Sequence, residues 1–470
     1  MERRFAERKQ AMLAECAVGA ETAVRLPLGL KQFLLPFTSR FRQVAQRLHA
    51  EEFCQGLLSN VKRKNVESIA YEHDQERRNL QHFMGGAAWD HAPLIDELCE
   101  QVGRELGEAD GVLVIDPSAF PKQGQQSVGV AQQWCGRLGK VTNCQVGVYL
   151  AYVSRREHAL CDFRLYLPEE WTHDRKRCRA AGVPAKVRFA TRHEQALDMI
   201  RARGKTLPHA WITADDEFGK VTHFRRDLHA LGERYLLAIP SNITARVLDG
   251  DELPHSGPGG PTARPFVSVA SLRDELPATA WTRIDVRDGT KGPLLVEIAT
   301  LPRVQTKDNR RCMKFAETLV FLRYRDDHHH RHEESYLSNA PTSTSAGEFA
   351  RVISAERRVE EGLRRAKSEA GLADYEVRNW NAWHHHQTLS LVATWFLVRE
   401  TRQGQQTTPA LTVPQVRQMI ARTLQRQWNQ LHPAAIATSV TRRLERNEEA
   451  RFYHHGTHNS LPPLRSQQRR

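Results

Sequence analysis

The sequence has no closely spaced cysteine pairs and no long apolar segments, and we expect no export signal. Its eight cysteines are scattered over 470 residues and form no Cys-x-x-Cys pair, so neither a zinc ribbon nor a redox motif is indicated. The longest nearly apolar run, Leu389 to Val398, is too short for a membrane span, which needs about 20 residues. Arg3 and Arg4 are followed by charged residues rather than an apolar stretch, which argues against export. We therefore expect a cytoplasmic protein.

Acidic residues are also in deficit. The chain has 68 Lys and Arg against 55 Asp and Glu, a formal net charge of +13 and a pI near 9.5. Apolar residues make up 40% of the chain, which is enough for a globular core. A basic globular protein favours a polyanionic partner, and nucleic acid is the first polyanion to consider.

The spacing of apolar residues divides the chain into five parts. Residues 1–108 are predicted to be helical, 109–240 to alternate between strands and helices, and 241–346 to be rich in strands. Residues 347–400 resume with a long helix, and 401–470 form a basic helical end with a disordered tail. Three strands followed by alternating helices and strands predict an α/β fold with a mixed sheet.

Two predicted strands end in an aspartate. The run Val112 to Ile115 leads into Asp116, and Ala210 to Ala214 leads into Asp215. Open α/β sheets place their ligands in the crevice at the carboxyl ends of strands, so the two carboxylates are candidate ligands of a divalent metal. The alternative is that each aspartate merely caps a helix or a turn.

A third carboxylate is available on the helix predicted from residue 347. Glu360 and Lys367 lie seven residues apart, on one face of that helix. A site with two metal ions needs such a third carboxylate, and the lysine would face a phosphate. The alternative is an ordinary solvated helix face.

Several blocks of the sequence resemble bacterial insertion-sequence transposases of the DDE type. They occur in the family's order between residues 30 and 400. The blocks are Asp116 to Gly124, Ser127 to Val130, Trp134 to Lys140, Asn143 to Val148, Leu165 to Pro168, Ala214 to Gly219, Tyr336 to Asn339, Val359 to Glu361 with Lys367, and Tyr375 to Arg378 with Trp380 and Trp383. The resemblance implies an RNase H-like catalytic domain with a β-strand insertion before the glutamate helix, flanked by helical N- and C-terminal regions.

The same resemblance implies the chemistry. Asp116, Asp215 and Glu360 would form the triad and hold two Mg²⁺ ions, with Mn²⁺ as a substitute. Asp116 would bridge the ions. The substrate would be double-stranded DNA with terminal inverted repeats, cut at the ends and joined to target DNA by a homodimer in the nucleoid. The residues expected to contact DNA are Lys62, Arg63, Lys64, Lys122, Arg137, Lys140, Lys367 and Arg378. Two alternatives are a DNA-binding regulator derived from a transposase and an RNase H-like nuclease without strand transfer.

The glutamate block departs from the family's pattern at two positions. That pattern often reads Tyr-x2-Arg-x3-Glu-x6-Lys, and here the first two positions are Ile353 and Glu356. Arg357 or Arg358 is a candidate to replace the missing cation.

Two carboxylates adjacent in sequence to the triad residues are alternative candidates. Asp216 lies one residue further along than Asp215, and its side chain is expected to point in a different direction from that of Asp215. Glu361 is rotated by about 100° from Glu360 around the helix.

Runs of histidines and one tryptophan suggest two further functions, zinc binding and base stacking. Residues 328–330 and 384–386 are consecutive histidines, which point in different directions and are poorly placed to share one zinc ion. Trp281 could stack on a flipped base, as an insertion-domain tryptophan does in related transposases, but core packing is the simpler interpretation.

Overall fold

The computed structural model describes residues 2–73, 77–249, 264–289, 292–308, 311–326, 330–431, 435–456 and 461–464. The chain forms two compact units. Unit 1 comprises Met1–Ala88, Glu369–Glu376 and Arg399–Arg470, and unit 2 comprises Trp89–Ser368 and Val377–Val398.

The secondary structure described in unit 1 is helical. Its helices are α1 (Glu2–Ala14), α2 (Ala20–Thr38), α3 (Val44–Leu58), α4 (Val66–Glu72), α5 (Arg77–Gln81), the π-helical turn η1 (His82–Gly86), α15 (Val413–Leu431) and α16 (Ala435–Gly456). Helix α2 packs against α3 and α15 around buried residues such as Phe33, Phe37 and Leu57. The helical segment formed by α5 and η1 ends at Gly86, because the pair Gly85 and Gly86 has low helix propensity.

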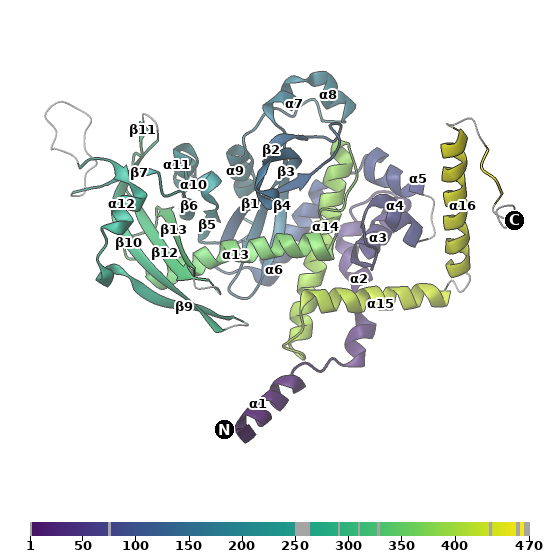
Figure 1. Cartoon of the computed structure of the whole chain (residues 1–470), viewed down its shortest axis with the longest axis horizontal. Coiled ribbons are helices and arrows are strands. Elements are labelled where there is room, and N and C mark those ends of the chain that lie inside the picture. Colours follow the sequence, from purple (N-terminus) through teal and green to yellow (C-terminus); the bar gives the residue numbers. More distant parts are fainter. Residues whose placement is uncertain are drawn as a thin grey trace. The chain divides into compact units, whose positions relative to one another are not determined.

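Unit 2 is built on one mixed sheet of thirteen strands (Figure 1). The strands are β1 (Val112–Pro121), β2 (Ala131–Cys135), β3 (Lys140–Val153), β4 (His158–Tyr166), β5 (Trp211–Ala214), β6 (Tyr235–Ile239), β7 (Thr244–Val247), β8 (Val267–Ser268), β9 (Thr282–Gly289), β10 (Gly292–Asp308), β11 (Arg311–Cys312), β12 (Glu317–Arg325) and β13 (Arg331–Ser338).

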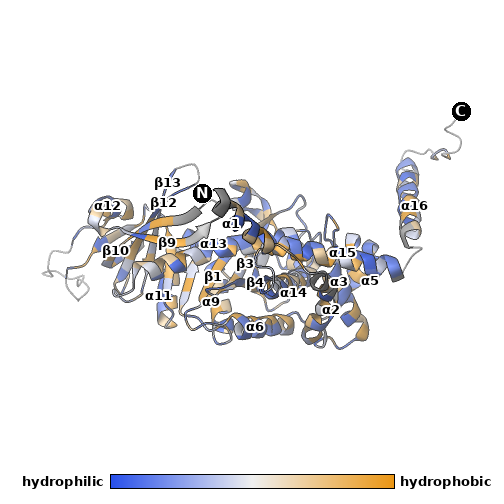
Figure 2. Cartoon of the chain, turned by 90° about the horizontal axis from the view of Figure 1, so that it is seen from below, coloured by the Kyte–Doolittle hydropathy of each residue, from blue (hydrophilic) through white to orange (hydrophobic). Residues whose placement is uncertain are grey.

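Helices and short turns connect these strands. They are α6 (Ala92–Leu106), η2 (Gly136–Leu138), α7 (Glu169–His173), α8 (Arg175–Ala180), α9 (Arg192–Arg203), α10 (Asp216–Gly219), α11 (Thr222–Ala230), α12 (Val269–Asp274), η3 (Ala278–Ala280), α13 (Ala346–Glu369) and α14 (Trp380–Gln405). Hydrophobic and hydrophilic residues are interleaved along α6 (Figure 2), as expected for an amphipathic helix that packs on a sheet.

The central strands have the topology that the resemblance implies. β4, β3 and β1 are antiparallel neighbours, and β5 and β6 follow β1 as parallel strands. Residues 112–115 of β1 are all buried, which explains their continuous apolar run. The α/β fold class with an RNase H-like core is thus confirmed.

The inserted strands extend the same sheet. β13 pairs antiparallel with β6, β12 pairs with β13, and β10 pairs with β12. A hydrophobic cluster that includes Ile239, Phe321 and Leu337 crosses the junction, and Trp281 packs against it. The guanidinium of Arg323 lies 3.9 Å above the Trp281 ring. Trp281 therefore has the packing role rather than a free aromatic face.

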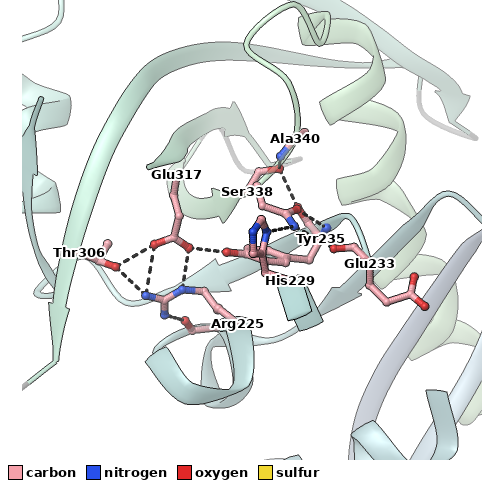
Figure 3. A network of polar contacts seen from close by, with 10 residues as sticks. Arg225, His229, Glu233, Tyr235, Thr306, Glu317, Ser338 and Ala340 are labelled. Atoms are coloured by element: carbon pink, nitrogen blue, oxygen red, sulfur yellow. Dashed lines mark hydrogen bonds and ion pairs between the residues drawn. The ribbon is translucent and has the colours of Figure 1, made fainter. Parts of the chain in front are cut away.

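A buried polar network joins the two parts of this sheet (Figure 3). Arg225 on α11 donates through Nε to Glu317 on β12 at 2.8 Å. The Tyr235 hydroxyl on β6 donates to the same carboxylate at 2.6 Å, and the Thr306 hydroxyl on β10 donates to it at 2.8 Å. Both charges are almost fully buried, so the core strands and the inserted strands share one ion pair.

Within the described residues, none of the helices combines the length and the hydropathy needed to cross a bilayer.

Candidate active site

Asp116 lies where two central strands separate. The parallel pairing of β1 with β5 ends at Ile115 and Ala214. The antiparallel pairing with β3 continues to Pro121, so β1 runs five residues beyond the predicted end of the strand. The prediction of the strand end was wrong because it considered only one neighbour. Asp116 thus directly follows the last residue of β1 that pairs with β5.

Asp215 follows β5 directly and also caps a helix. Its Oδ1 accepts a hydrogen bond from the backbone N–H of Glu217 at 3.1 Å, which starts α10. The capping alternative is therefore correct, but it leaves the second oxygen free of that bond. Gly219 ends α10 against β6, and a Cβ there would clash with the Ala238 carbonyl. This close approach of α10 to β6 fixes the position of Asp215, which caps the start of α10.

Helix α13 brings two glutamates to the site. Glu356 and Glu360 lie one turn apart, and both line a cavity of about 670 Å³ together with Asp215. Other residues around this cavity are Tyr324, Glu333, Glu334, Tyr336, Ile353 and Arg357. The sequence offers Glu356 as one of several carboxylates on this helix, at a position where the family's pattern has an arginine. The four-residue spacing from Glu360 was the signal that could have identified it.

The carboxylates influence one another strongly. Burial, with smaller contributions from Asp215 and Glu360, raises the pKa of Asp116 to about 7. Burial and the neighbouring Glu217 and Asp216 raise the pKa of Asp215 to about 7. Burial, Asp215 and Asp116 raise the pKa of Glu356 to about 8, and its shielded Oε2 has no hydrogen-bond partner among the described residues. Such shifts mark a site that lacks compensating positive charge.

The structure distinguishes Glu360 from Glu361 by position, but it does not distinguish Asp215 from Asp216 in the same way. Asp216 is exposed and lines the same cavity as Asp215. Glu361 points to two arginines instead, with Arg365 at 2.6 Å and Arg364 at 3.6 Å. Of the two adjacent glutamates, only Glu360 lines the cavity that Asp215 also lines.

Lys367 lies near Asp116, two turns along α13 from Glu360. Its Nζ donates to the Ser118 hydroxyl at 2.7 Å and lies 5.4 Å from the Phe120 ring centre. The two arginines considered as replacement cations differ. Arg357 lines the cavity and pairs with Glu334 at 3.2 Å, whereas Arg358 donates to backbone carbonyls of Ser154 and Arg156. Arg357 is therefore the better placed of the two.

The predicted DNA contacts in unit 2 lie on neighbouring loops. Arg137 and Lys140 are exposed in the turn between β2 and β3, and Lys122 follows β1. Arg378 is exposed and donates to the Gln126 side chain at 3.5 Å. The backbone N–H of Val128 donates to the Arg378 carbonyl at 2.9 Å, which joins this segment to the loop after β1.

The basic cluster in unit 1 divides into two kinds of residue. Lys62 and Arg63 are exposed, and Arg63 lies 3.9 Å from Glu376. Lys64 is only 4% exposed, and its ammonium donates to the Glu369 carbonyl at the end of α13. Burial lowers the pKa of Lys64 to about 8. We therefore assign Lys64 a structural role and leave it out of the proposed DNA contacts.

The donor set fits a hard divalent cation in its chemistry. Asp116, Asp215, Glu356 and Glu360 are all carboxylates, and oxygen ligands of this kind suit Mg²⁺ or Mn²⁺. As the described side chains stand, no three acidic, histidine or cysteine side chains are close enough together to hold an ion. A cation would have to draw these carboxylates together.

The histidines at 384–386 are buried in a core. His385 stacks on Trp89 with ring centres 3.5 Å apart, and Nδ1 of His384 donates to the Trp380 carbonyl at 2.9 Å. Burial lowers the pKa of His384 well below its usual value. His328 and His329 lie outside the described residues.

One comparison with known proteins, the match to a family model, agrees with the resemblance. The family model described as DDE superfamily endonuclease matches residues 36–293. Among solved structures, the chain is similar to a piggyBac transposase in a synaptic complex with hairpin DNA. The identity is 9% and the TM-score 0.38, over 93% of this chain and 83% of that chain. Among curated proteins, none matches this sequence.

Proposed function

The chain belongs to the family of DDE superfamily endonucleases, and we propose that it is the transposase of a bacterial insertion sequence. It would cut DNA at the ends of its own element and join the freed ends to target DNA. The observation that supports this proposal most directly is that Asp215 and Glu360 line one cavity, and that both carboxylates are close enough to Asp116 to raise its pKa.

Each residue of the site has a defined task in this proposal. Asp116, Asp215 and Glu360 hold two divalent cations, Mg²⁺ in the cell. When bound, such cations activate the attacking oxygen and stabilise the leaving oxygen. Lys367, beside Asp116, contacts a phosphate oxygen of the strand being cut. Lys122, Arg137, Lys140 and Arg378 hold the flanking phosphates, and Lys62 and Arg63 hold the element's end.

The reaction needs no covalent bond between protein and DNA. Water adds its oxygen to the phosphorus at the element's end, and the 3′ oxygen leaves and takes a proton. The resulting 3′-hydroxyl then attacks a target phosphodiester, so one phosphodiester bond forms as another breaks. The paired ends would be held by a homodimer.

The test is a cleavage and joining assay. Purified protein is incubated with labelled DNA that carries the flanking genomic ends and with a supercoiled target plasmid, in Mg²⁺, Mn²⁺ or chelator. We expect metal-dependent cuts at a defined junction and end-labelled plasmid, both lost in Asp215→Asn. Cuts without labelled plasmid would favour the nuclease without strand transfer. Specific binding without cuts under any metal would favour the regulator.

A further inference from the structure

The turn between β2 and β3 exposes apolar side chains that no core uses. Trp134 is 59% exposed, Leu138 46% and Val141 61%. Trp134 lies opposite Val141 in the antiparallel pairing, so the two form one outward patch. The alternate side chains, Cys135 and Cys144, are buried with Val146 on the inner face. We call residues 131–144 the β2–β3 hairpin.

The hairpin has a rigid base. Nδ2 of Asn143 donates to the carbonyls of Lys122 at 2.7 Å and Gly124 at 2.9 Å. Nε2 of Gln133 donates to the Cys144 carbonyl at 3.0 Å. At the tip, Gly139 has φ of 60°, a left-handed conformation that favours glycine. The outward patch is therefore held in place rather than left to collapse.

The charge around this patch has one sign. Residues 117–156 contain no aspartate or glutamate, whereas Arg137 and Lys140 are exposed at the tip. An exposed aromatic ring between cations is the surface by which proteins bind unpaired nucleic-acid strands, because bases stack on the ring and phosphates pair with the cations. A protein partner would more often meet such a patch with aspartates or an apolar face alone.

The hairpin tip also lies near Lys367. Arg137 is close enough to Lys367 to act on its charge, and Lys367 contacts Ser118 two residues after Asp116. Strand β3 continues from the hairpin along β1 and lies opposite Asp116 at Tyr149, beyond the hairpin (Figure 1). DNA with a phosphate held by Lys367 would therefore lie beside Arg137 at the hairpin tip.

We propose that Trp134 stacks on an unpaired DNA base beside the cleavage site, while Arg137 and Lys140 hold the adjacent phosphates. This inference rests on the proposed function for the identity of the DNA. It adds that the protein binds an opened strand next to the cut, and that it binds such DNA more tightly than a continuous duplex.

The test measures binding without cleavage. The full-length chain with Asp116→Asn is titrated with end DNA that has either a paired flank or an unpaired flank containing 2-aminopurine. Trp134→Ala should weaken binding to the DNA with the unpaired flank about 5- to 100-fold and leave the affinity for the paired duplex nearly unchanged. It should also abolish the change in 2-aminopurine fluorescence that accompanies binding. Trp134→Phe should retain most of the affinity. The matched control is Leu231→Ala, at an apolar residue elsewhere in unit 2 that is 39% exposed. It should change neither the two affinities nor the fluorescence signal.

Three results would overturn the inference. The first is an equal loss of affinity for both DNAs in Trp134→Ala, and the second is no loss of affinity for either DNA. The third is a change in oligomeric state with Trp134→Ala, which would make the patch a contact between copies of the chain. Because no cleavage is needed, the failure of the proposed function is scored separately. Wild-type protein that never cuts, but shows the stacking signal, would reject the transposase and retain the hairpin as a strand-binding element.

Discussion

At the scale of single residues, the site is defined by uncompensated negative charge. Asp116, Asp215 and Glu356 all have pKa values raised far above those of ordinary carboxyls, and burial is the largest cause for each. In a family whose enzymes use divalent metal ions, these residues store the electrostatic free energy that a cation would release. They therefore destabilise the metal-free protein at neutral pH.

This leads to a prediction on pH and stability. For Asp116, the pKa is about 7 in the native state against an ordinary 3.8. Between these values the native state binds more protons than the unfolded state, so this group's stabilisation is present at low pH and is lost as pH rises through 7. In chelator, raising the pH from 5 to 8 should lower the unfolding temperature of wild type by a few degrees more than that of Asp116→Asn.

Thermal unfolding followed by circular dichroism at several pH values measures this difference. Asp90→Asn, at an exposed carboxylate in the same unit, is the control and should behave like wild type. Parallel pH dependences for wild type and Asp116→Asn would mean that Asp116 is not buried among like charges.

At the scale of elements, short segments position the carboxylates. β1 and β5 separate after Ile115, α10 fixes Asp215, and α13 presents Glu356 and Glu360 from one face. Figure 1 shows α13 running along the sheet from the inserted strands toward α14. The geometry of the candidate site thus depends on backbone packing as much as on the acidic side chains.

Gly219 tests this dependence. In Gly219→Ala the new methyl group would press on the Ala238 carbonyl, so α10 must move away from β6. We expect a loss of stability of about 1–3 kcal/mol and cleavage at least tenfold slower, since Asp215 starts that helix. Gly232→Ala would not separate these effects because Gly232 has a positive φ. Gly124→Ala, at a glycine with open space, is the better control and should fold normally.

The element scale also shows what the sequence could predict. Continuous apolar runs identified β1 and β5 and so placed Asp116 and Asp215, because a strand buried on both faces is apolar at consecutive positions. The continuation of β1 to Pro121 and the burial of Lys64 depend on partners distant in the sequence, β3 and Glu369, which no local pattern encodes. Glu356 was misjudged for a related reason. It was compared with the family's arginine instead of being placed on the helix face of Glu360.

At the scale of the whole molecule, the proposed chemistry belongs to unit 2, and both units carry basic residues. Within unit 2 the inserted strands continue the catalytic sheet through β13, so the insertion and the core form one folded body. The ion pair of Arg225 and Glu317 lies at this junction and is almost fully buried (Figure 3).

Breaking that pair should destabilise unit 2 as a whole. Glu317→Ala leaves the guanidinium of Arg225 buried without its carboxylate, and such losses cost about 3–5 kcal/mol. Denaturant unfolding of the full chain measures the effect. Glu333→Ala, at a partly exposed carboxylate paired with Arg331, should cost less than about 1 kcal/mol. Equal effects of the two variants would show that the junction is held by apolar packing alone.

The most direct test of the central claim compares two adjacent aspartates. Wild type, Asp116→Asn, Asp215→Asn and Asp216→Asn are assayed on the same end DNA for binding by gel shift and for cleavage with Mg²⁺ or chelator. The account predicts that all four proteins bind the DNA alike and that wild type and Asp216→Asn cut it only with Mg²⁺. The cleavage rates of Asp116→Asn and Asp215→Asn should be at least a thousandfold lower. Cleavage retained by Asp116→Asn, or unaffected by chelator, would contradict it.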